Sequence, residues 1–195
     1  MNSSIKLFFS HFYRLLGHCF SLLRFYIFCY PLLASCGSFS YIISPLYISH
    51  PFISLGSRTF ISWDARIEAV PFYNKEIFKP RLTIGDNVSI EQRLHLTFAS
   101  SLSIAHSTTI LSDVVITDID HQYSDPNVPA YAQSINVASV NIDHHCLICK
   151  GVVILPGTTL GNHCVVAANS VVRGYFPPFS LIAGSPARIV KVLSD

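Results

Sequence analysis

The run T-D-I-D-H at residues 117–121 holds the side chains best suited to acid–base chemistry. Imidazole titrates near neutral pH, so His121 can accept a proton and later release it. A carboxylate at Asp118 or Asp120 can orient the ring, as carboxylates do in catalytic triads. The alternative is a polar loop histidine that has no partner. We predict that His121 is a general base, with Asp118 and Asp120 as the candidates that orient it.

A second run, H-H-C-L-I-C at residues 144–149, has the residue types that bind zinc or carry out thiol redox chemistry. Side chains can bind one ion only if the backbone directs them to one place. The element that carries this run therefore decides whether such chemistry is available.

An aliphatic residue recurs at every sixth position between residues 142 and 172, and a small residue follows four places after each of the first five. The aliphatic positions are Ile142, Ile148, Ile154, Leu160, Val166 and Val172. A helix repeats near 3.6 residues and a strand at 2, so a strict period of six is neither. It indicates the hexapeptide repeat, in which a short strand and a tight turn alternate, three to a triangular coil.

The repeat also decides what the cysteines do. Cys146 and Cys164 are eighteen residues apart, one full coil, so we expect them at the same inward corner. His145 and His163 have the same spacing, at the adjacent outward position, and Cys149 falls on another face. Inward and outward side chains cannot converge on one ion. We therefore predict no metal site, and cysteines that act as small hydrophobic residues.

The same register extends upstream in three triplets of aliphatic residues. These triplets begin at Leu55, Ile84 and Ile104. With the two coils from the later stretch, they predict about five coils. The register breaks at residues 68–83, 97–103 and 117–141. We expect loops there, at 68–83 and 117–141 above all, and loops on a rigid scaffold often carry function.

The amino-terminal segment differs in kind, because no acidic residue precedes Asp64. Its polar residues are three or four apart, on one face of a predicted helix over about residues 7–33. They are His11, Arg14, His18, Ser21 and Arg24. Such a helix either caps the coil or lies on an anionic membrane with these groups toward the headgroups, and the missing carboxylates favour the membrane. We predict a segment and linker at 1–50 and a coil domain at 51–195.

Composition narrows the class of protein. A formal charge of +2 with 12% charged residues gives no case for nucleic-acid binding. Six scattered cysteines without a recognisable secretory signal suggest a reducing compartment. We expect a cytoplasmic protein, held at the inner face of the cytoplasmic membrane if the amino-terminal helix binds there.

Four motifs carry a family resemblance: IGDNVSI at 84–90, ITDIDH at 116–121, VVILPGTTLGNHCVVAANSVV at 152–172 and PPFSLIAGSPARIVK at 177–191. Over residues 55–192 the chain resembles the hexapeptide-repeat acyltransferases, and most of all the O-acetyltransferases of bacterial lipopolysaccharide, capsule and exopolysaccharide. The resemblance implies an all-β fold, a left-handed parallel β-helix after the helical segment. It also implies a homotrimer that binds acetyl-CoA between subunits, and it places His121 at the family's catalytic position.

Matching positions also imply binding residues. For the coenzyme they are Lys150, Ala168, Arg173, Arg188 and Lys191. The basic members suit phosphate oxygens, although a solvated basic tail is the alternative. For the acceptor sugar we expect Glu91, Arg93, His95 and Tyr123.

Three functions follow from this reading. The first is acetyl-CoA-dependent O-acetylation of a surface polysaccharide or its lipid-linked precursor. The second is N-acetylation of a nucleotide-linked amino sugar, and the third is a non-catalytic β-helix scaffold. A membrane-facing helix favours the lipid-linked acceptor.

Overall fold

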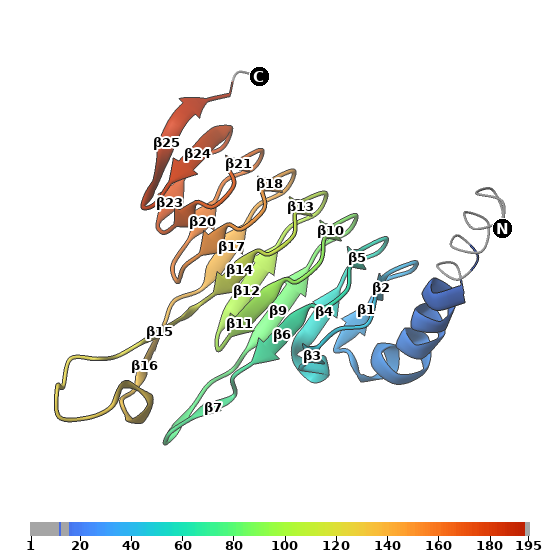
Figure 1. Cartoon of the computed structure of the whole chain (residues 1–195), viewed down its shortest axis with the longest axis horizontal. Coiled ribbons are helices and arrows are strands. Elements are labelled where there is room, and N and C mark those ends of the chain that lie inside the picture. Colours follow the sequence, from blue (N-terminus) through green and yellow to red (C-terminus); the bar gives the residue numbers. More distant parts are fainter. Residues whose placement is uncertain (1–11, 13–15, 194–195) are drawn as a thin grey trace, which may run out of the picture.

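The chain forms a left-handed parallel β-helix, as the family resemblance implies, with a helical segment at its amino-terminal end (Figure 1). The computed structural model describes residue 12 and residues 16–193. Three parallel sheets form the sides of the prism. Their strand orders are β1-β4-β9-β12-β17-β20-β23, β2-β5-β10-β13-β18-β21-β24-β25 and β3-β6-β11-β14-β19-β22.

Each complete coil contributes one strand to each sheet. The first three coils are β1 (Ser35–Cys36), β2 (Tyr41–Ile42), β3 (Tyr47–Ile48); β4 (Ile53–Leu55), β5 (Phe60–Ile61), β6 (Arg66–Ala69); and β9 (Arg81–Ile84), β10 (Ser89–Ile90), β11 (His95–Phe98). The next three are β12 (Ser101–Ile104), β13 (Thr109–Ile110), β14 (Val115–Thr117); β17 (Val140–Ile142), β18 (Leu147–Ile148), β19 (Val153–Ile154); and β20 (Thr159–Leu160), β21 (Val165–Val166), β22 (Val171–Val172).

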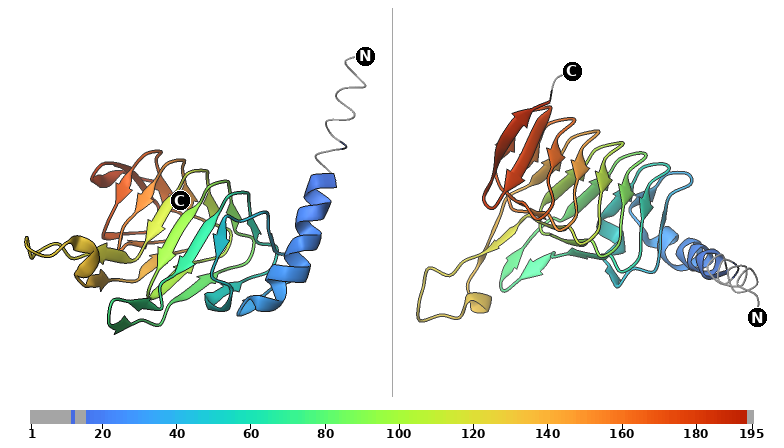
Figure 2. Two further views of the ribbon diagram at one scale, coloured as in Figure 1. Left: turned by 60° about the horizontal axis from the view of Figure 1, so that its bottom comes forward. Right: turned by 45° about the horizontal axis from the view of Figure 1, so that its top comes forward.

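A seventh coil is started but not completed. It holds β23 (Tyr175–Phe176) and β24 (Ser180–Gly184), against which β25 (Ala187–Val192) turns back antiparallel. Two hairpins leave the prism: β7 (Phe72–Tyr73) with β8 (Glu76–Ile77), and β15 (Ile119–His121) with β16 (Ile135–Val137). Figure 2 shows both hairpins projecting on the same side of the column.

The predicted aliphatic column is confirmed in its register. Ile84 is the strand partner of Leu55 and Ile104, and Ile142 is that of Ile104 and Leu160. These side chains are almost fully buried, and burying one such side chain is worth about 1.5–3 kcal/mol. The core is therefore one continuous aliphatic stack along the prism axis.

Two details of the prediction are wrong. The prism has six complete coils rather than about five, because residues 35–48 form a coil and not a linker. Cys36, Ile42 and Ile48 already follow the six-residue step, and Pro45 lies at a corner, where it does not interrupt a strand. The break at residues 97–103 is also no loop, since only two residues separate β11 from β12.

The amino-terminal segment is helical but faces differently from the prediction. Residues 16–24 are α-helical and continue into the π-helical η1 (Phe25–Cys29) and the 3₁₀ turn η2 (Tyr30–Leu32). The predicted polar residues His11 and Arg14 lie outside the described residues.

The polar side of this helix is turned toward the first coil. The ring of His18 meets that of Tyr41 edge-on, with centroids 5.9 Å apart, and Ser21 Oγ is 3.3 Å from Ser44 Oγ. Phe25, only 1% exposed, joins the core. The helix therefore covers the open end of the β-helix, where the coil offers it hydroxyl and aromatic partners.

Two further 3₁₀ turns, η3 (His50–Phe52) and η4 (Ala130–Ala132), complete the structure. Within the described part of the chain, no helix has the length and apolar character needed to cross a membrane.

Candidate active site

The hairpin β15–β16 positions His121. It leaves the prism directly after β14, and His121 pairs with Ile135 on the returning strand. Asp118, which is 0% exposed, fixes the point where the hairpin leaves the prism. Its carboxylate accepts hydrogen bonds from the backbone N–H groups of Ala99 and Ser100, each at 2.8 Å. The Asp118 carbonyl also accepts a bond from Ala138 N, at 2.9 Å. Both ends of the hairpin are thereby fixed to the rigid column.

The second hairpin meets the first at His121. The hydroxyl of Tyr73, on β7, is 3.3 Å from His121 Nδ1, and the two rings pack edge-on with centroids 5.5 Å apart. The same hydroxyl donates a hydrogen bond to the Tyr131 carbonyl at 2.9 Å. Asn74 Nδ2 adds a bond to the Gln133 carbonyl, also at 2.9 Å.

These contacts favour one tautomer of the neutral His121 imidazole. A tyrosine hydroxyl has one hydrogen, and Tyr73 donates it to the Tyr131 carbonyl, which can only accept. The Tyr73 oxygen therefore accepts from His121, so the neutral ring carries its proton on Nδ1. Nε2 is left with a free lone pair, which is the form that a general base requires.

A groove of about 340 Å³ lies beside the ring. Its walls combine aliphatic side chains with hydroxyl and imidazole groups. They come from Val70, Tyr73, His95, Thr97, Val115, Thr117, Ile119, His121 and Ile135. A second hollow, lined by Asp120, His121, Gln122, Tyr123, Ser124 and Asn136, opens on the more polar side of the hairpin. His121 is common to both, so a substrate in either can reach it.

Neither predicted orienting carboxylate contacts the ring. All of the hydrogen bonds found for the Asp118 carboxylate go to Ala99 and Ser100, including the Ser100 hydroxyl at 2.8 Å. Asp120 instead forms an ion pair with Arg173, with 2.8 Å between Oδ2 and Nη2. The side-chain group that contacts the ring at Nδ1 is instead the Tyr73 hydroxyl.

The four predicted acceptor residues divide into two groups. His95 lines the groove, and Tyr123 lines the second hollow. Glu91 and Arg93 line neither, since they lie at the corner between β10 and β11. Arg93 binds both oxygens of Asp113 there, and this contact, with help from Lys150, lowers the pKa of Asp113 to about 2.

The five predicted coenzyme residues lie in three places. Lys150 and Ala168 occupy the same corner of consecutive coils, where Asn169 N bonds the Lys150 carbonyl at 3.0 Å. Arg188 and Lys191 are on β25, opposite Ala183 and Leu181 of β24. Arg173 contacts Asp120 beside the hairpin. One copy of the chain thus does not gather all five around His121.

Sequence reasoning missed Tyr73. It lies in residues 68–83, which were recognised only as a stretch without six-residue register. The available signal was a tyrosine in one of the two long breaks in the repeat. Two loops that leave the same side of a β-helix can contact each other. The spacing gives no way to tell which residue of one hairpin reaches the other.

A family model described as "Bacterial transferase hexapeptide (six repeats)" matches residues 139–174. Over these residues the chain is similar to the hexapeptide-repeat transferases. This hexapeptide-repeat protein is 40% identical over 114 residues to the "Putative lipopolysaccharide biosynthesis O-acetyl transferase WbbJ" of Escherichia coli, covering 55% of the chain and 58% of that relative.

Another relative is the galactoside O-acetyltransferase of Escherichia coli, 27% identical over 139 residues, which cover 62% of this chain and 67% of that one. The probable acetyltransferase Rv3034c of Mycobacterium tuberculosis is 33% identical over 110 residues. The alignments span 58% and 37% of the length of WbbJ and of Rv3034c.

Solved structures share the fold of this hexapeptide-repeat protein. The N-acyltransferase AntD from Bacillus cereus, in complex with dTDP and 3-hydroxybutyryl-CoA, matches with a TM-score of 0.72 at 18% identity, covering 84% of this chain and 85% of that one. A galactoside acetyltransferase in complex with coenzyme A gives 0.58 at 20% identity, covering 93% and 81%.

Proposed function

We propose that this protein is an acetyl-CoA-dependent O-acetyltransferase that acts on a sugar hydroxyl of a bacterial surface polysaccharide or its lipid-linked precursor. The observation that carries the proposal is the contact between the Tyr73 hydroxyl and His121 Nδ1, which favours the tautomer with Nε2 free to accept a proton. The relatives named as O-acetyltransferases support the choice of reaction.

The reaction then follows from the site. His121 Nε2 takes the proton of the acceptor hydroxyl as its oxygen attacks the thioester carbon. The tetrahedral intermediate collapses, the carbon–sulfur bond breaks, and the imidazolium returns its proton to the departing thiolate. The mixed walls of the groove fit a sugar ring, which has apolar faces and hydroxyl edges.

The test is transfer by the purified full chain. Acetyl-CoA and a panel of polysaccharide and lipid-linked acceptors are supplied, and both thiol release and acetyl ester are measured. His121→Ala should abolish most transfer, while His106→Ala, a surface histidine away from the groove, should not. Preferred transfer to a nucleotide-linked amino sugar would support the N-acetyltransferase alternative. The absence of transfer and of thiol release with every acceptor would support a scaffold.

We propose that the coenzyme binds between the subunits of a homotrimer. Within one copy, the predicted coenzyme residues Lys150 and Arg188 have no contact with His121, so a neighbouring copy would complete the site. Light scattering measures the mass of the particle and so tests the homotrimer. Mixing His121→Ala with Arg188→Ala subunits tests whether the site is shared between subunits. A shared site should recover activity in mixed trimers, whereas a site within one copy should not.

We also propose that the amino-terminal helix rests on the membrane that carries the acceptor, which would place the enzyme at the cytoplasmic face. Its polar side faces the coil, so apolar side chains point outward. The exposed ones include Leu16, Phe20, Leu23, Ile27 and Phe28. Arg24 is exposed beside them, and the first carboxylate of the chain is Asp64, which suits anionic headgroups.

Vesicles of neutral and anionic lipid distinguish this surface from a contact between copies. The full chain should sediment with anionic vesicles, and a Phe20→Ser/Leu23→Ser/Phe28→Ser variant should bind at least tenfold more weakly. Ile77→Ser removes an exposed apolar side chain elsewhere and should bind normally. A variant that changes the mass of the particle but not vesicle binding would show instead that the face joins copies of the chain.

A further inference from the structure

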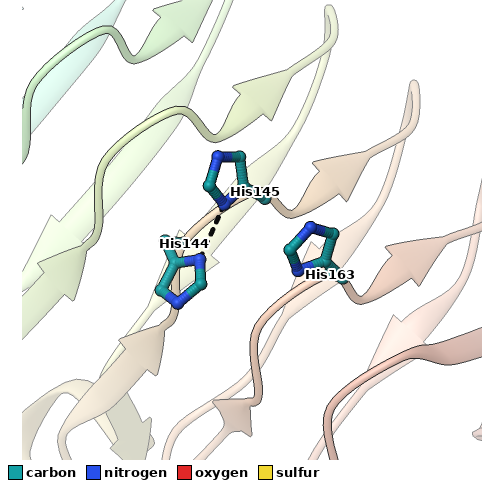
Figure 3. A group of neighbouring side chains, drawn as sticks. All are labelled: His144, His145 and His163. Carbon is teal, nitrogen blue, oxygen red and sulfur yellow. Dashed lines mark hydrogen bonds between the residues drawn. The ribbon is translucent and has the colours of Figure 1, made fainter. Parts of the chain in front are cut away.

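Three histidines from two consecutive coils share one corner of the prism. His145 lies between β17 and β18, and His163 lies at the equivalent place one coil later, between β20 and β21. Both adopt left-handed backbone angles, with φ of 59° and 57°, so their side chains leave the corner in the same direction. Their rings are stacked, with centroids 4.8 Å apart (Figure 3).

His144 brings a third ring to the same place. Its Nδ1 is 2.7 Å from Nδ1 of His145, and its ring meets that of His163 edge-on at 5.8 Å. One nitrogen of each of the three residues lies within 4.8 Å of the others (Figure 3). Imidazole is a preferred ligand for zinc, copper, nickel and cobalt ions.

We propose that His144, His145 and His163 form a binding site for a divalent ion of the zinc type, which joins the fifth and sixth coils. Nothing in the proposed acetyl transfer uses these residues. Three histidines and a water molecule are a sufficient ligand set for zinc. The ion would add a cross-link between turns that otherwise meet through backbone hydrogen bonds.

The geometry requires only small adjustments. Zinc–nitrogen bonds are about 2.0–2.1 Å, so two ligand nitrogens of a tetrahedral site are roughly 3.3 Å apart. The closest pair is already near this value at 2.7 Å, and the widest, at 4.8 Å, closes by rotation of a surface ring. Asp143 Oδ1 is 4.0 Å from His144 Nε2, where a carboxylate can orient a ligand that binds through Nδ1.

Ring stacking alone is the competing explanation. His106 stacks on His144 with centroids 4.9 Å apart, and Phe179 stacks on His163 at the same distance. A hydrogen bond between His144 Nδ1 and His145 Nδ1 also brings those two rings together. Neither the stacking nor this hydrogen bond requires a nitrogen of His163 to lie within 4.8 Å of the other two. Cys146 and Cys164 take no part, since both are buried on the inward side, as the register predicts. The expectation of no metal site considered only cysteine and histidine together, and it overlooked the three histidines acting without the cysteines.

The experiment uses the full chain without a histidine tag, treated with a chelator and then titrated with Co²⁺. The parent should bind one Co²⁺ per chain with the visible absorption of a tetrahedral site, and Zn²⁺ should displace it and raise the melting temperature. His163→Phe should bind at least tenfold more weakly. Phenylalanine is tolerated there, since Phe179 occupies the next equivalent corner with φ of 60° and would keep the stack.

His106→Ala is the matched control. It removes a stacked ring from the same column and leaves the three proposed ligands intact, so it should keep stoichiometric binding. His145→Asn should lose binding, because asparagine tolerates the left-handed backbone but supplies no imidazole. Absence of saturable Co²⁺ binding by the parent would overturn the proposal. Equal binding by His163→Phe, or an equal loss in His106→Ala, would do so as well.

Discussion

The Tyr73 hydroxyl lies 3.3 Å from His121 Nδ1, across 48 positions of sequence and between two hairpins that leave the β-helix separately. Tyr73→Phe keeps the ring contact and removes the oxygen. One neutral hydrogen bond is worth about 0.5–1.5 kcal/mol, so turnover should fall by roughly two- to tenfold. The measurement is steady-state transfer with saturating acceptor. An unchanged rate would show that the hydroxyl does not fix the base.

His121→Ala should cost more, because it removes the base and not only its orientation. General-base catalysis contributes typically ~10²–10⁴-fold, and turnover should fall by that factor. Coenzyme affinity, measured by calorimetry, should hold, since the proposed coenzyme residues do not contact the ring. Near-normal turnover in this variant would place the base elsewhere, with His95 in the same groove as the next candidate.

Asp118→Asn and Asp120→Asn should differ in how much stability they cost. Asp118 is buried and accepts three hydrogen bonds, so an amide leaves donors opposed and should cost about 1–3 kcal/mol of stability. Asp120→Asn breaks an ion pair between half-exposed side chains and should cost at most about 1 kcal/mol. Thermal melts separate the two. Equal melting temperatures would contradict the anchoring role of Asp118.

The contrast between these aspartates shows what the sequence can and cannot predict. The strands and their register follow from a strict six-residue period, because a side chain at each such position has only the prism interior to fill. The same periodicity places His121 at a boundary correctly. It does not show where a polar side chain points once the chain leaves the column, so Asp118 looked like a partner of His121 although it supports the turn at Ala99.

The amino-terminal helix illustrates the same limit. Its polar spacing favoured a face turned to membrane headgroups over a cap on the coil, whereas His18 and Ser21 pack on the first coil. The open end of a β-helix offers aromatic rings and hydroxyl groups, and these accept a partly polar helix face. The chemistry of the surface on which a helix packs decides which face of the helix turns inward. The spacing of residues within the helix carries no information about that surface.

Asp113 predicts a pH dependence. Its contacts with Arg93, and secondarily with Lys150, lower its pKa in the folded protein to about 2. A lowered carboxyl pKa contributes stability above the ordinary value near 4, and this contribution is lost as the pH falls toward 2. Asp113→Asn should therefore melt slightly below the parent at pH 7, and the difference should shrink as the pH approaches 2. A difference that is constant with pH would contradict this.

Cys146 and Cys164 predict how closely the corners are packed. Both thiols are buried, and each lies 3.3 Å from a backbone carbonyl of the next turn, that of Gly161 or of Pro177. A Cβ added at Gly161 would come within 2.5 Å of Pro178 N, so this corner has no spare room. Cys164→Leu should therefore overpack it and cost about 1–3 kcal/mol.

For a chain of this size that cost corresponds to a fall of roughly 2–12 °C in melting temperature. Cys149→Ser, at a partly exposed position on another face, is the matched control and should melt within about 2 °C of the parent. Acetyl transfer at 25 °C should persist in both variants, because neither thiol contacts His121. A Cys164→Leu protein as stable as the parent would show that the corner can adjust to a larger side chain. Steric restriction would then not explain the small residues at these corners.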